Sequence, residues 1–244
     1  MNIGTGFSDP TAGSWAKHGG CAVLLAGALI AANAQAAGSV TVPNPSSPAD
    51  NCYPFDCTNG NTQYQQVYTA SAFSGPIAIS SITFFQDLTN FPSSIGVVPG
   101  TYTISFSTTS AGVNALSSTF SSNIGTDNQT FFSGTLGGLG NTLTITGPPF
   151  DYNPMNGNLL MNVSMNYSES VNNGSGNTYM LADSSGTLSS RNWGSGTSGN
   201  PDGIGLVTQF NTGAPTVPEP ATWALYAAGL AGAGLMLRRR RRSA

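Results

Sequence analysis

The strongest constraint on this chain is an uncharged run of 17 residues, Ala221–Leu237, that ends directly against a cluster of five arginines. As a helix, the run is roughly 25 Å long, close to the ~30 Å hydrocarbon core of a bilayer. Trp223 and Tyr226 lie near its outer end, where aromatic rings favour the headgroup region. Arginines are costly to move through lipid and mark the cytoplasmic end of a span. The pattern predicts a transmembrane helix over 221–237, with a cytoplasmic stop formed by Arg238, Arg239, Arg240, Arg241 and Arg242.

The residues before this run narrow the prediction. Pro218, Glu219 and Pro220 precede the span, and the tripeptide, span and arginine cluster together resemble the PEP-CTERM sorting signal of exosortase substrates in Gram-negative bacteria. The resemblance covers residues 217–244. It implies that a membrane-embedded transpeptidase recognises the tripeptide at the outer face, cuts there and discards the span. The alternative is an ordinary single-span anchor.

The N-terminus has the features of a secretory signal peptide over residues 1–36. Lys17 supplies a positive charge, and an apolar stretch of 12 residues follows over 21–32. Ala34 and Ala36 flank one residue and match an A-x-A cleavage site. The sequence therefore predicts export by the Sec machinery, with signal cleavage after Ala36 and the membrane orientation N-terminus outside, C-terminus inside.

The exported part, residues 37–216, is acidic. Its only base, Arg191, stands against eight carboxylates, so its net charge is −7, compared with −3 for the whole chain. Such a surface repels phosphate groups, and no nucleic-acid partner is expected. About 180 residues suffice for one domain with its own core. The acids are scattered singly along the chain: Asp50, Asp56, Asp87, Asp127, Asp151, Glu169, Asp183 and Asp202.

Two cysteines remain after export, Cys52 and Cys57. A pair this close in an oxidising compartment predicts a local disulfide that fixes the N-terminal loop. The C-x₄-C spacing does not match the C-x-x-C redox motif. Cys21 lies in the signal segment and is not favoured as a lipidation site, because the apolar run follows it instead of preceding it. No metal site is predicted, because the only histidine, His18, is lost with the signal.

Alternation of apolar and polar residues with period two predicts that the domain is built from strands. Short polar turns separate the strands, and no segment of the domain has a sustained helical period. We therefore expect an all-β class, an antiparallel β-sandwich or jelly roll over residues 37–210. Residues 194–203 are expected to form a loop, and 211–216 a linker to the sorting signal. The expected strands are 65–72, 77–85, 101–107, 129–132, 142–146, 159–166, 178–182 and 204–210.

Two internal stretches, residues 64–73 and 150–161, resemble segments of ectodomains that often precede this sorting signal. This second resemblance implies an extracellular β-domain. It implies no activity for particular residues.

The exported part offers few groups for catalysis. Without histidine, a Ser-His-Asp or Cys-His arrangement is impossible, and no catalytic residue or cofactor is predicted. Paired carboxylates could act as in glycosidases, and calcium could bind Asp and Asn oxygens, but the acids are expected to serve as solvated or turn-capping groups. Tyr152, Tyr179 and Trp193 could stack on sugar rings, although core packing is the simpler role. Arg191 and Asn192, next to Trp193, are the best candidates for an exposed contact, although a structural ion pair is the favoured role.

We therefore expect a non-enzymatic exported protein that an exosortase delivers to the cell surface or extracellular matrix. By analogy with the family, its setting is exopolysaccharide or biofilm. The alternatives are a carbohydrate-binding or adhesive module, and a secreted glycan hydrolase that uses carboxylates. Two acids within about 5–10 Å of each other in a cleft would favour the hydrolase, and a flat row of exposed aromatic rings would favour glycan binding.

Overall fold

A computed structural model describes residues 38–43, 48–57, 60–92, 96–138, 140–167 and 178–213. The chain divides into two units, Met1–Asn33 and Ala34–Ala244. The first unit lies wholly outside the described residues, so the description below concerns the second. The predicted signal peptide with Ala34 and Ala36, and the whole predicted sorting signal, also lie outside the described residues.

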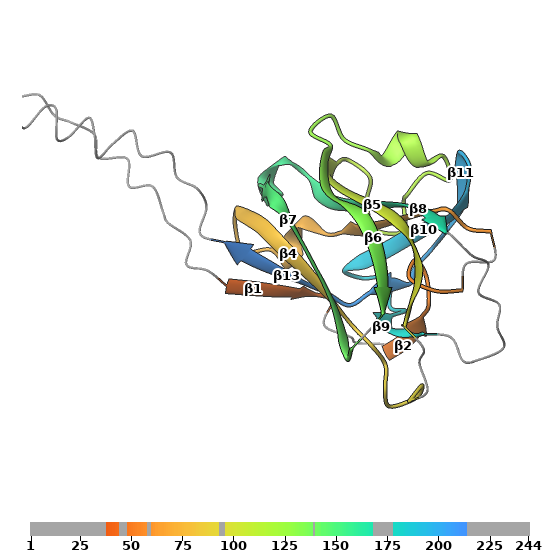
Figure 1. Cartoon of the computed structure of the whole chain (residues 1–244). Helices are drawn as coiled ribbons and strands as arrows, with labels where there is room; N and C mark the ends of the chain where they lie inside the picture. The colour runs from red at the N-terminus through yellow and green to blue at the C-terminus, as the bar shows by residue number, and fades with distance from the viewer. Residues whose placement is uncertain are drawn as a thin grey trace, which may run out of the picture. The chain divides into compact units, whose positions relative to one another are not determined.

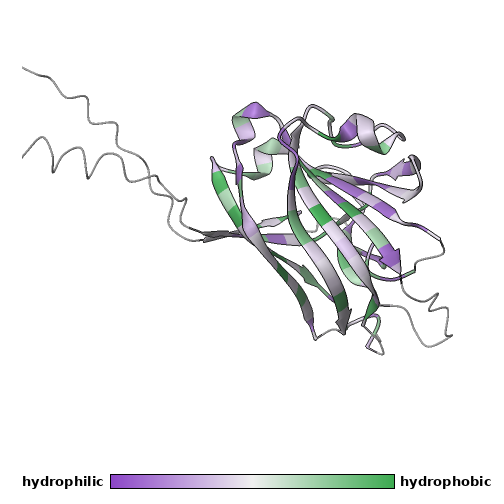
Figure 2. Cartoon of the chain, turned by 45° about the horizontal axis from the view of Figure 1, so that its top comes forward, coloured by the Kyte–Doolittle hydropathy of each residue, from purple (hydrophilic) through white to green (hydrophobic). Residues whose placement is uncertain are grey.

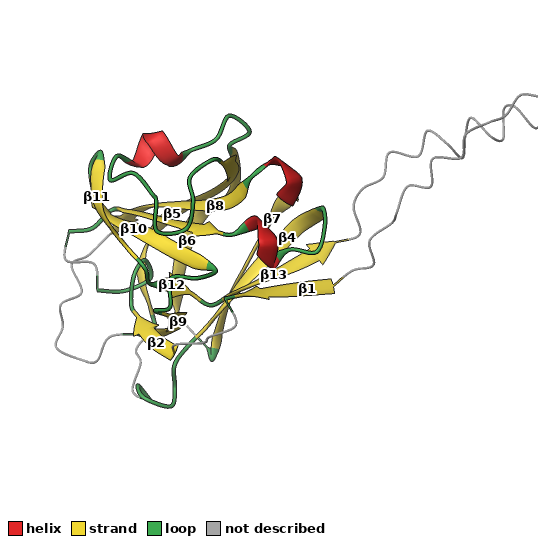
Figure 3. Ribbon diagram, turned by 180° about the vertical axis from the view of Figure 1, so that it is seen from behind, coloured by secondary structure: helices red, strands yellow, loops and turns green. Residues whose placement is uncertain are grey.

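The described part is all-β, as predicted (Figure 3). Every strand pairing is antiparallel, and the only helical segments in the described ranges are short 3₁₀ turns, the longest of which is Phe120–Asn123. The strands are β1 Gly38–Val42, β2 Pro48–Asn51, β3 Gln63–Tyr68, β4 Ile77–Phe85, β5 Val97–Thr109, β6 Gln129–Gly138, β7 Thr142–Tyr152, β8 Asn158–Tyr167, β9 Met180–Asp183, β10 Ser189–Ser195, β11 Ser198–Asp202, β12 Gly205–Leu206 and β13 Thr208–Gly213.

The strands form three sheets (Figure 1). A six-stranded sheet has the order β11-β10-β3-β8-β5-β6, and a four-stranded sheet has the order β1-β13-β4-β7. A small third sheet has the order β12-β9-β2. Because every pairing is antiparallel, the sheets can each keep one face on the core and the other in water.

The core lies between the two larger sheets. Phe210 of β13 packs against Tyr68 of β3 and Phe106 of β5, with ring centroids 4.9 and 6.3 Å apart. Phe106 also contacts Phe150 of β7, at 5.7 Å. All these rings are at most 3% exposed, and they belong to one continuous apolar cluster. Figure 2 shows the alternation of apolar and polar residues along the strands that produces this buried layer.

The sequence prediction located most of the strands. Residues 77–85 match β4 at both ends, and the expected strands at 101–107, 129–132 and 142–146 are the centres or starts of longer strands. The single strand expected over 204–210 is divided at Val207 into β12 and β13, which belong to different sheets. Three other expectations were wrong. The strand expected over 65–72 ends at Tyr68, since Ala70–Ala72 form a 3₁₀ turn.

The other two errors concern segments rich in small polar residues. Residues 194–203, expected as a loop, form the end of β10 and all of β11, a hairpin that turns at Gly196 with a φ of 64°. Residues 211–213, expected as the start of the linker, continue β13 and pair with β1 and β4. In both cases, strand pairing overrides the weak local strand propensity of Gly, Asn and Ser.

Candidate functional site

The two ends of the described domain lie side by side (Figure 1). β1 pairs with β13, and Gly38 stands opposite Thr212. The Gly38 amide donates to the Thr212 hydroxyl at 3.1 Å, and this hydroxyl donates to the Gly38 carbonyl at 3.0 Å. Four residues, 214–217, separate β13 from Pro218, and four extended residues span at most about 14 Å. The predicted processing site is therefore close, along the chain, to a strand held on both sides.

Cys52 and Cys57 form the predicted disulfide, with their Cα atoms 5.5 Å apart. The carboxylate of Asp56 secures the loop that they close, because it accepts hydrogen bonds from the Cys57 amide at 2.7 Å and from the Thr178 amide at 2.6 Å. Burial raises the pKa of Asp56, while these two amides favour its ionised form. The disulfide loop is thus attached to the segment that leads into β9.

The disulfide loop also places Tyr53 against β10. The Tyr53 ring stacks on Trp193, with centroids 5.0 Å apart and an angle of 13° between the rings. The guanidinium carbon of Arg191 lies 5.9 Å from the Tyr53 ring and 5.8 Å from the Trp193 ring. Both rings are half-buried, so this aromatic pair is partly accessible to solvent.

Arg191 makes a structural ion pair, the role that the sequence favoured over an exposed contact. Its Nε and Nη2 atoms donate to the two carboxylate oxygens of Asp202 at 2.8 and 2.9 Å. Asp202 also accepts from Trp193 Nε1 at 2.9 Å and from the Ile204 amide at 3.0 Å. Asn192 is fully buried and donates to the carbonyl of Ser117 at 3.1 Å. The sequence thus identified the right residues, and their role in the structure is to hold β10, β11 and the neighbouring loop together.

Two acids that are far apart in the sequence meet at the small sheet. Asp50 of β2 and Asp87, just after β4, share a hydrogen bond between their carboxyl groups. Burial and the adjacent Asp87 raise the pKa of Asp50 to about 6, and the same bond lowers the pKa of Asp87. The Asp87 carboxylate also accepts from the amides of Thr89 and Asn90 at 3.0 and 3.1 Å. Carboxyl groups in direct contact leave no room for a glycosidic bond between them, because glycosidase pairs stand about 5 Å or more apart.

The other proposed sugar-stacking residues are engaged within the fold. Tyr152 is 1% exposed and packs edge-on against Phe73, so it is a core residue. Tyr179 stacks on Phe91 with centroids 3.9 Å apart. Within the described ranges, the large apolar side chains that are exposed are Leu88 and Met155, and neither is aromatic. The flat row of exposed aromatic rings that would indicate glycan binding is therefore not found in this part of the chain.

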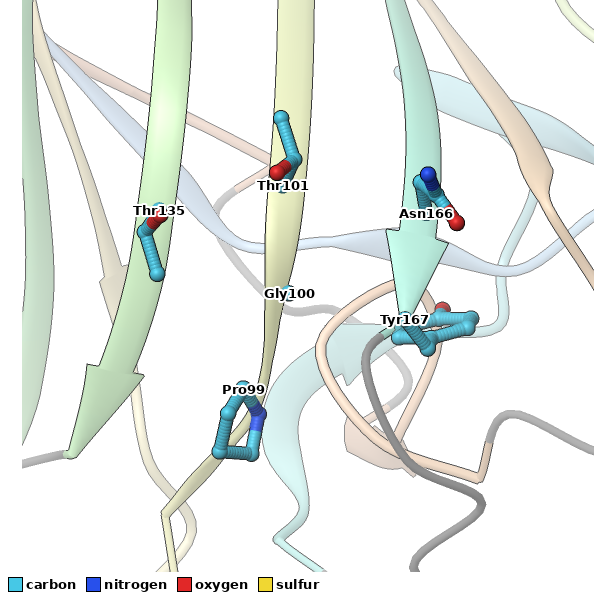
Figure 4. A pocket seen from close by; sticks show the side chains of 6 residues that line it. All are labelled: Pro99, Gly100, Thr101, Thr135, Asn166 and Tyr167. Atoms are coloured by element: carbon cyan, nitrogen blue, oxygen red, sulfur yellow. The ribbon is translucent and has the colours of Figure 1, made fainter.

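One feature of the outward face could not be found from the sequence. A hollow of about 210 Å³ lies where β5, β6 and β8 run side by side (Figure 4). Thr135, Thr101 and Asn166 line it and are direct cross-strand partners, so they form one row across three strands. Pro99, Gly100 and Tyr167 complete the lining. The spacing of these residues along the chain gives no sign of the row, because only the strand register brings them together.

Several predicted features cannot be placed, because they lie outside the described residues. They are the predicted span over 221–237, the tripeptide Pro218, Glu219 and Pro220, and the predicted cytoplasmic stop Arg238, Arg239, Arg240, Arg241 and Arg242. The helical segments that the structure describes include none with the length and apolar character to cross a membrane. Among the same residues, no three His, Cys, Asp or Glu side chains gather in a way that could hold a metal ion. The membrane span and its arginine stop therefore stay predictions.

Comparison with known proteins gives one finding. A family model described as the PEP-CTERM protein-sorting motif matches residues 216–241. The searches of curated proteins and of solved structures found no match. The matched segment contains the tripeptide, the apolar run and the first four arginines of the cluster, Arg238, Arg239, Arg240 and Arg241, which are the parts that carried the resemblance. The chain is therefore a PEP-CTERM protein, with a C-terminal exosortase sorting motif behind an all-β domain.

Proposed function

We propose that this protein is a non-enzymatic component of the bacterial surface or extracellular matrix, in an exopolysaccharide or biofilm setting. The sorting motif implies export toward the cell surface and processing by an exosortase. In the proposed sequence of events, the Sec machinery exports the chain and the signal peptide is removed. The C-terminal span then holds the β-sandwich domain outside the inner membrane until cleavage near Glu219.

The observation that carries this proposal is the sorting motif, and the position of β13 fits it. β13 ends at Gly213, and the motif begins at residue 216, so the folded domain and the processing site are nearly contiguous in the chain. β13 lies between β1 and β4, which holds the last described residues of the domain in a sheet. Such a domain can reach the surface folded and be released by a cut in the short segment that follows.

The non-enzymatic part of the proposal is supported by the use of the acids. The Asp202 carboxylate accepts hydrogen bonds from four donor atoms. The Asp87 carboxylate accepts from two backbone amides and from the Asn90 side chain, and the Asp56 carboxylate accepts from two backbone amides. Carboxylates engaged in this way stabilise loops and hairpins, and they are poorly placed to act as acid and base on a substrate. Asp127 has the same kind of role, since it accepts from the Thr108 amide at 2.7 Å.

The proposal is tested by replacing Glu219 with alanine in the full chain and following the protein in cell fractions. We expect the variant to remain in the inner membrane at its uncleaved mass, whereas the wild type leaves that membrane. The matched control is Asp151→Ala, which removes an exposed carboxylate on β7 and should be processed normally. Normal release of the Glu219 variant would refute sorting through this motif.

A carbohydrate-binding role is the second candidate function, and it fits within the first. The row of uncharged hydrogen-bonding side chains along the hollow favours it over the hydrolase alternative.

A further inference from the structure

We propose that the outward face of β6, β5 and β8, with the hollow at its end, is a binding site for an uncharged polysaccharide. This inference deepens the proposed function and rests on it for the setting. β5, β6 and β8 contain no charged residue, and the only charges in the strands of the six-stranded sheet are Arg191 and Asp202, which neutralise each other. Although residues 37–216 carry a net charge of −7, this sheet thus presents a broad neutral face.

The polar groups on this face form rows across the strands. The first row is Thr135, Thr101 and Asn166, and the register makes Thr101 the direct partner of the other two. All three side chains are exposed, and within the described residues they make no hydrogen bond to the rest of the chain. Neighbouring strands stand about 4.8 Å apart, so hydroxyl and amide groups recur at that step across the sheet. A row of free donors and acceptors is suited to a ligand that carries many hydroxyl groups.

A second row lies parallel to the first. Ser133, Thr103 and Ser164 are again cross-strand partners, and Gln63 of β3 extends the row. The Thr103 and Ser133 hydroxyls are 3.3 Å apart, and Gln63 donates to Ser164 at 3.3 Å. The second row is therefore partly paired with itself. The first row, which borders the hollow, keeps its groups free for a ligand.

The hollow supplies shape along the first row, since all three members of the row line it. Gly100 stands opposite Tyr167 in the β5–β8 register, and both line it (Figure 4). A Cβ at Gly100 would lie 2.8 Å from the Asn166 carbonyl oxygen, so the close strand approach here requires glycine. Tyr167 also borders the hollow, but its ring packs toward the core: its hydroxyl donates to the Pro54 carbonyl at 3.1 Å and to the sulfur of the buried Met165 at 3.0 Å. A recess bordered by several free hydroxyl and amide groups is suited to a ligand that carries many hydroxyl groups.

Other ligand classes fit this face less well. β5 and β8 are interior strands, so a peptide cannot add to them as a strand, and a peptide that paired with the free edge of β6 would lie beside the sheet and not over the rows. The row offers no exposed apolar side chain to anchor a peptide, and no Lys or Arg side chain to bind a nucleic acid or an acidic glycan. The opposite end of the same face is covered: Val67 of β3 and Leu160 of β8 pack there against Leu116 of the loop between β5 and β6. The open, polar part of the face is thus confined to the region of the two rows.

The test is affinity electrophoresis of the exported chain in native gels cast with soluble polysaccharides, in mild detergent. Dextran, a mixed-linkage β-glucan and a galactomannan serve as neutral probes, and alginate and hyaluronan as anionic probes. We expect retardation by at least one neutral polysaccharide and none by the anionic ones. Binding does not require C-terminal cleavage, so an unprocessed chain can be tested equally, and a failure of sorting is distinguishable from a failure of binding.

The variant that tests the site is Thr101→Val with Thr135→Val and Asn166→Ala, which removes the first row from an exposed surface. We expect the dissociation constant for the bound polysaccharide to rise at least tenfold, which corresponds to about 1.4 kcal/mol. The matched control, Thr142→Val with Thr146→Val, removes two exposed hydroxyls from β7 and should bind as the wild type does. The proposal is overturned if no neutral probe binds, if alginate binds equally well, or if the triple variant binds unchanged. It is also overturned if the triple variant instead changes the oligomeric state, since the face would then be a contact between copies of the chain.

Discussion

The ion pair between Arg191 and Asp202 should respond very differently to the loss of each partner. The Arg191 side chain is 7% exposed and the Asp202 side chain is 34% exposed. Replacing Asp202 with alanine leaves a buried guanidinium without its carboxylate and leaves Trp193 Nε1 and the Ile204 amide without an acceptor. Removing one partner of a buried pair costs about 3–5 kcal/mol. Because water already reaches about a third of Asp202, we expect a loss near the lower end, about 3 kcal/mol.

Replacing Arg191 with methionine should cost less, about 1–2 kcal/mol. Asp202 then keeps two hydrogen bonds and its access to water, while methionine fills part of the space beside Tyr53 and Trp193. In the double variant, the second substitution should cost clearly less than it does alone, because no unpaired charge is left behind. The free energies of unfolding are measured by urea denaturation.

Trp193 provides the spectroscopic probe for these measurements. In the processed form that we propose, Trp15 leaves with the signal peptide and Trp223 with the membrane span, so Trp193 is the single tryptophan that remains, and it lies in the cluster itself. Equal losses of stability for Arg191→Met and Asp202→Ala would refute the asymmetric burial on which this reasoning depends.

Two further predictions concern stability. Replacing Cys52 and Cys57 with serine should lower the free energy of unfolding by about 2 kcal/mol, as expected for a loop of about five residues. The same change should alter Trp193 fluorescence, because the Tyr53 ring loses its fixed position on Trp193. An unchanged denaturation midpoint would contradict a stabilising role of the disulfide. The chain should also be more stable at pH 5 than at pH 7. The pKa of Asp50 is about 6 in the folded chain and 3.8 in the unfolded chain, so at pH 5 the folded state binds a proton that the unfolded state releases. This contribution to stability is lost as the pH rises through 6. Below about pH 4, protonation of Asp87 reverses the trend, since its pKa is lowered by folding. Asp50→Asn should remove most of the difference in melting temperature between pH 5 and pH 7 and Asp151→Asn should not; an undiminished difference in the Asp50 variant would exclude the Asp50–Asp87 pair as its source.

The fold class could be predicted because period-two alternation is a local property. Tyr102, Ile104 and Phe106 alternate with polar residues, and all three are buried in β5. Prediction failed where strands depend on partners. β11, with the sequence Ser-Gly-Asn-Pro-Asp, has no strand propensity of its own and exists because it pairs with β10, which Arg191 and Asp202 connect.

The candidate sites likewise include features that the sequence predicts and features that depend on the folded structure. The disulfide and the importance of Arg191 and Trp193 could be predicted from spacing and from the scarcity of bases. The partner of Trp193 could not, because Tyr53 is brought to it only by the folded disulfide loop. The contact between Asp50 and Asp87 and the row through Thr101 also depend on which strands are neighbours, and the strand order β12-β9-β2 or β8-β5-β6 is not encoded by any local pattern.

The central claim is that both ends of the chain are removed around a β-domain whose ends meet in one sheet. Intact mass spectrometry of the form recovered from the cell surface or the medium tests it most directly, because one mass reports both termini. We predict a species that begins at Ala37, ends near Pro218–Pro220, lacks Arg238–Arg242, and is 2 Da lighter than its reduced form because of the Cys52–Cys57 bond. A surface form that still carries the arginine cluster, or recovery of the chain only from the cytosol at its full mass, would contradict it.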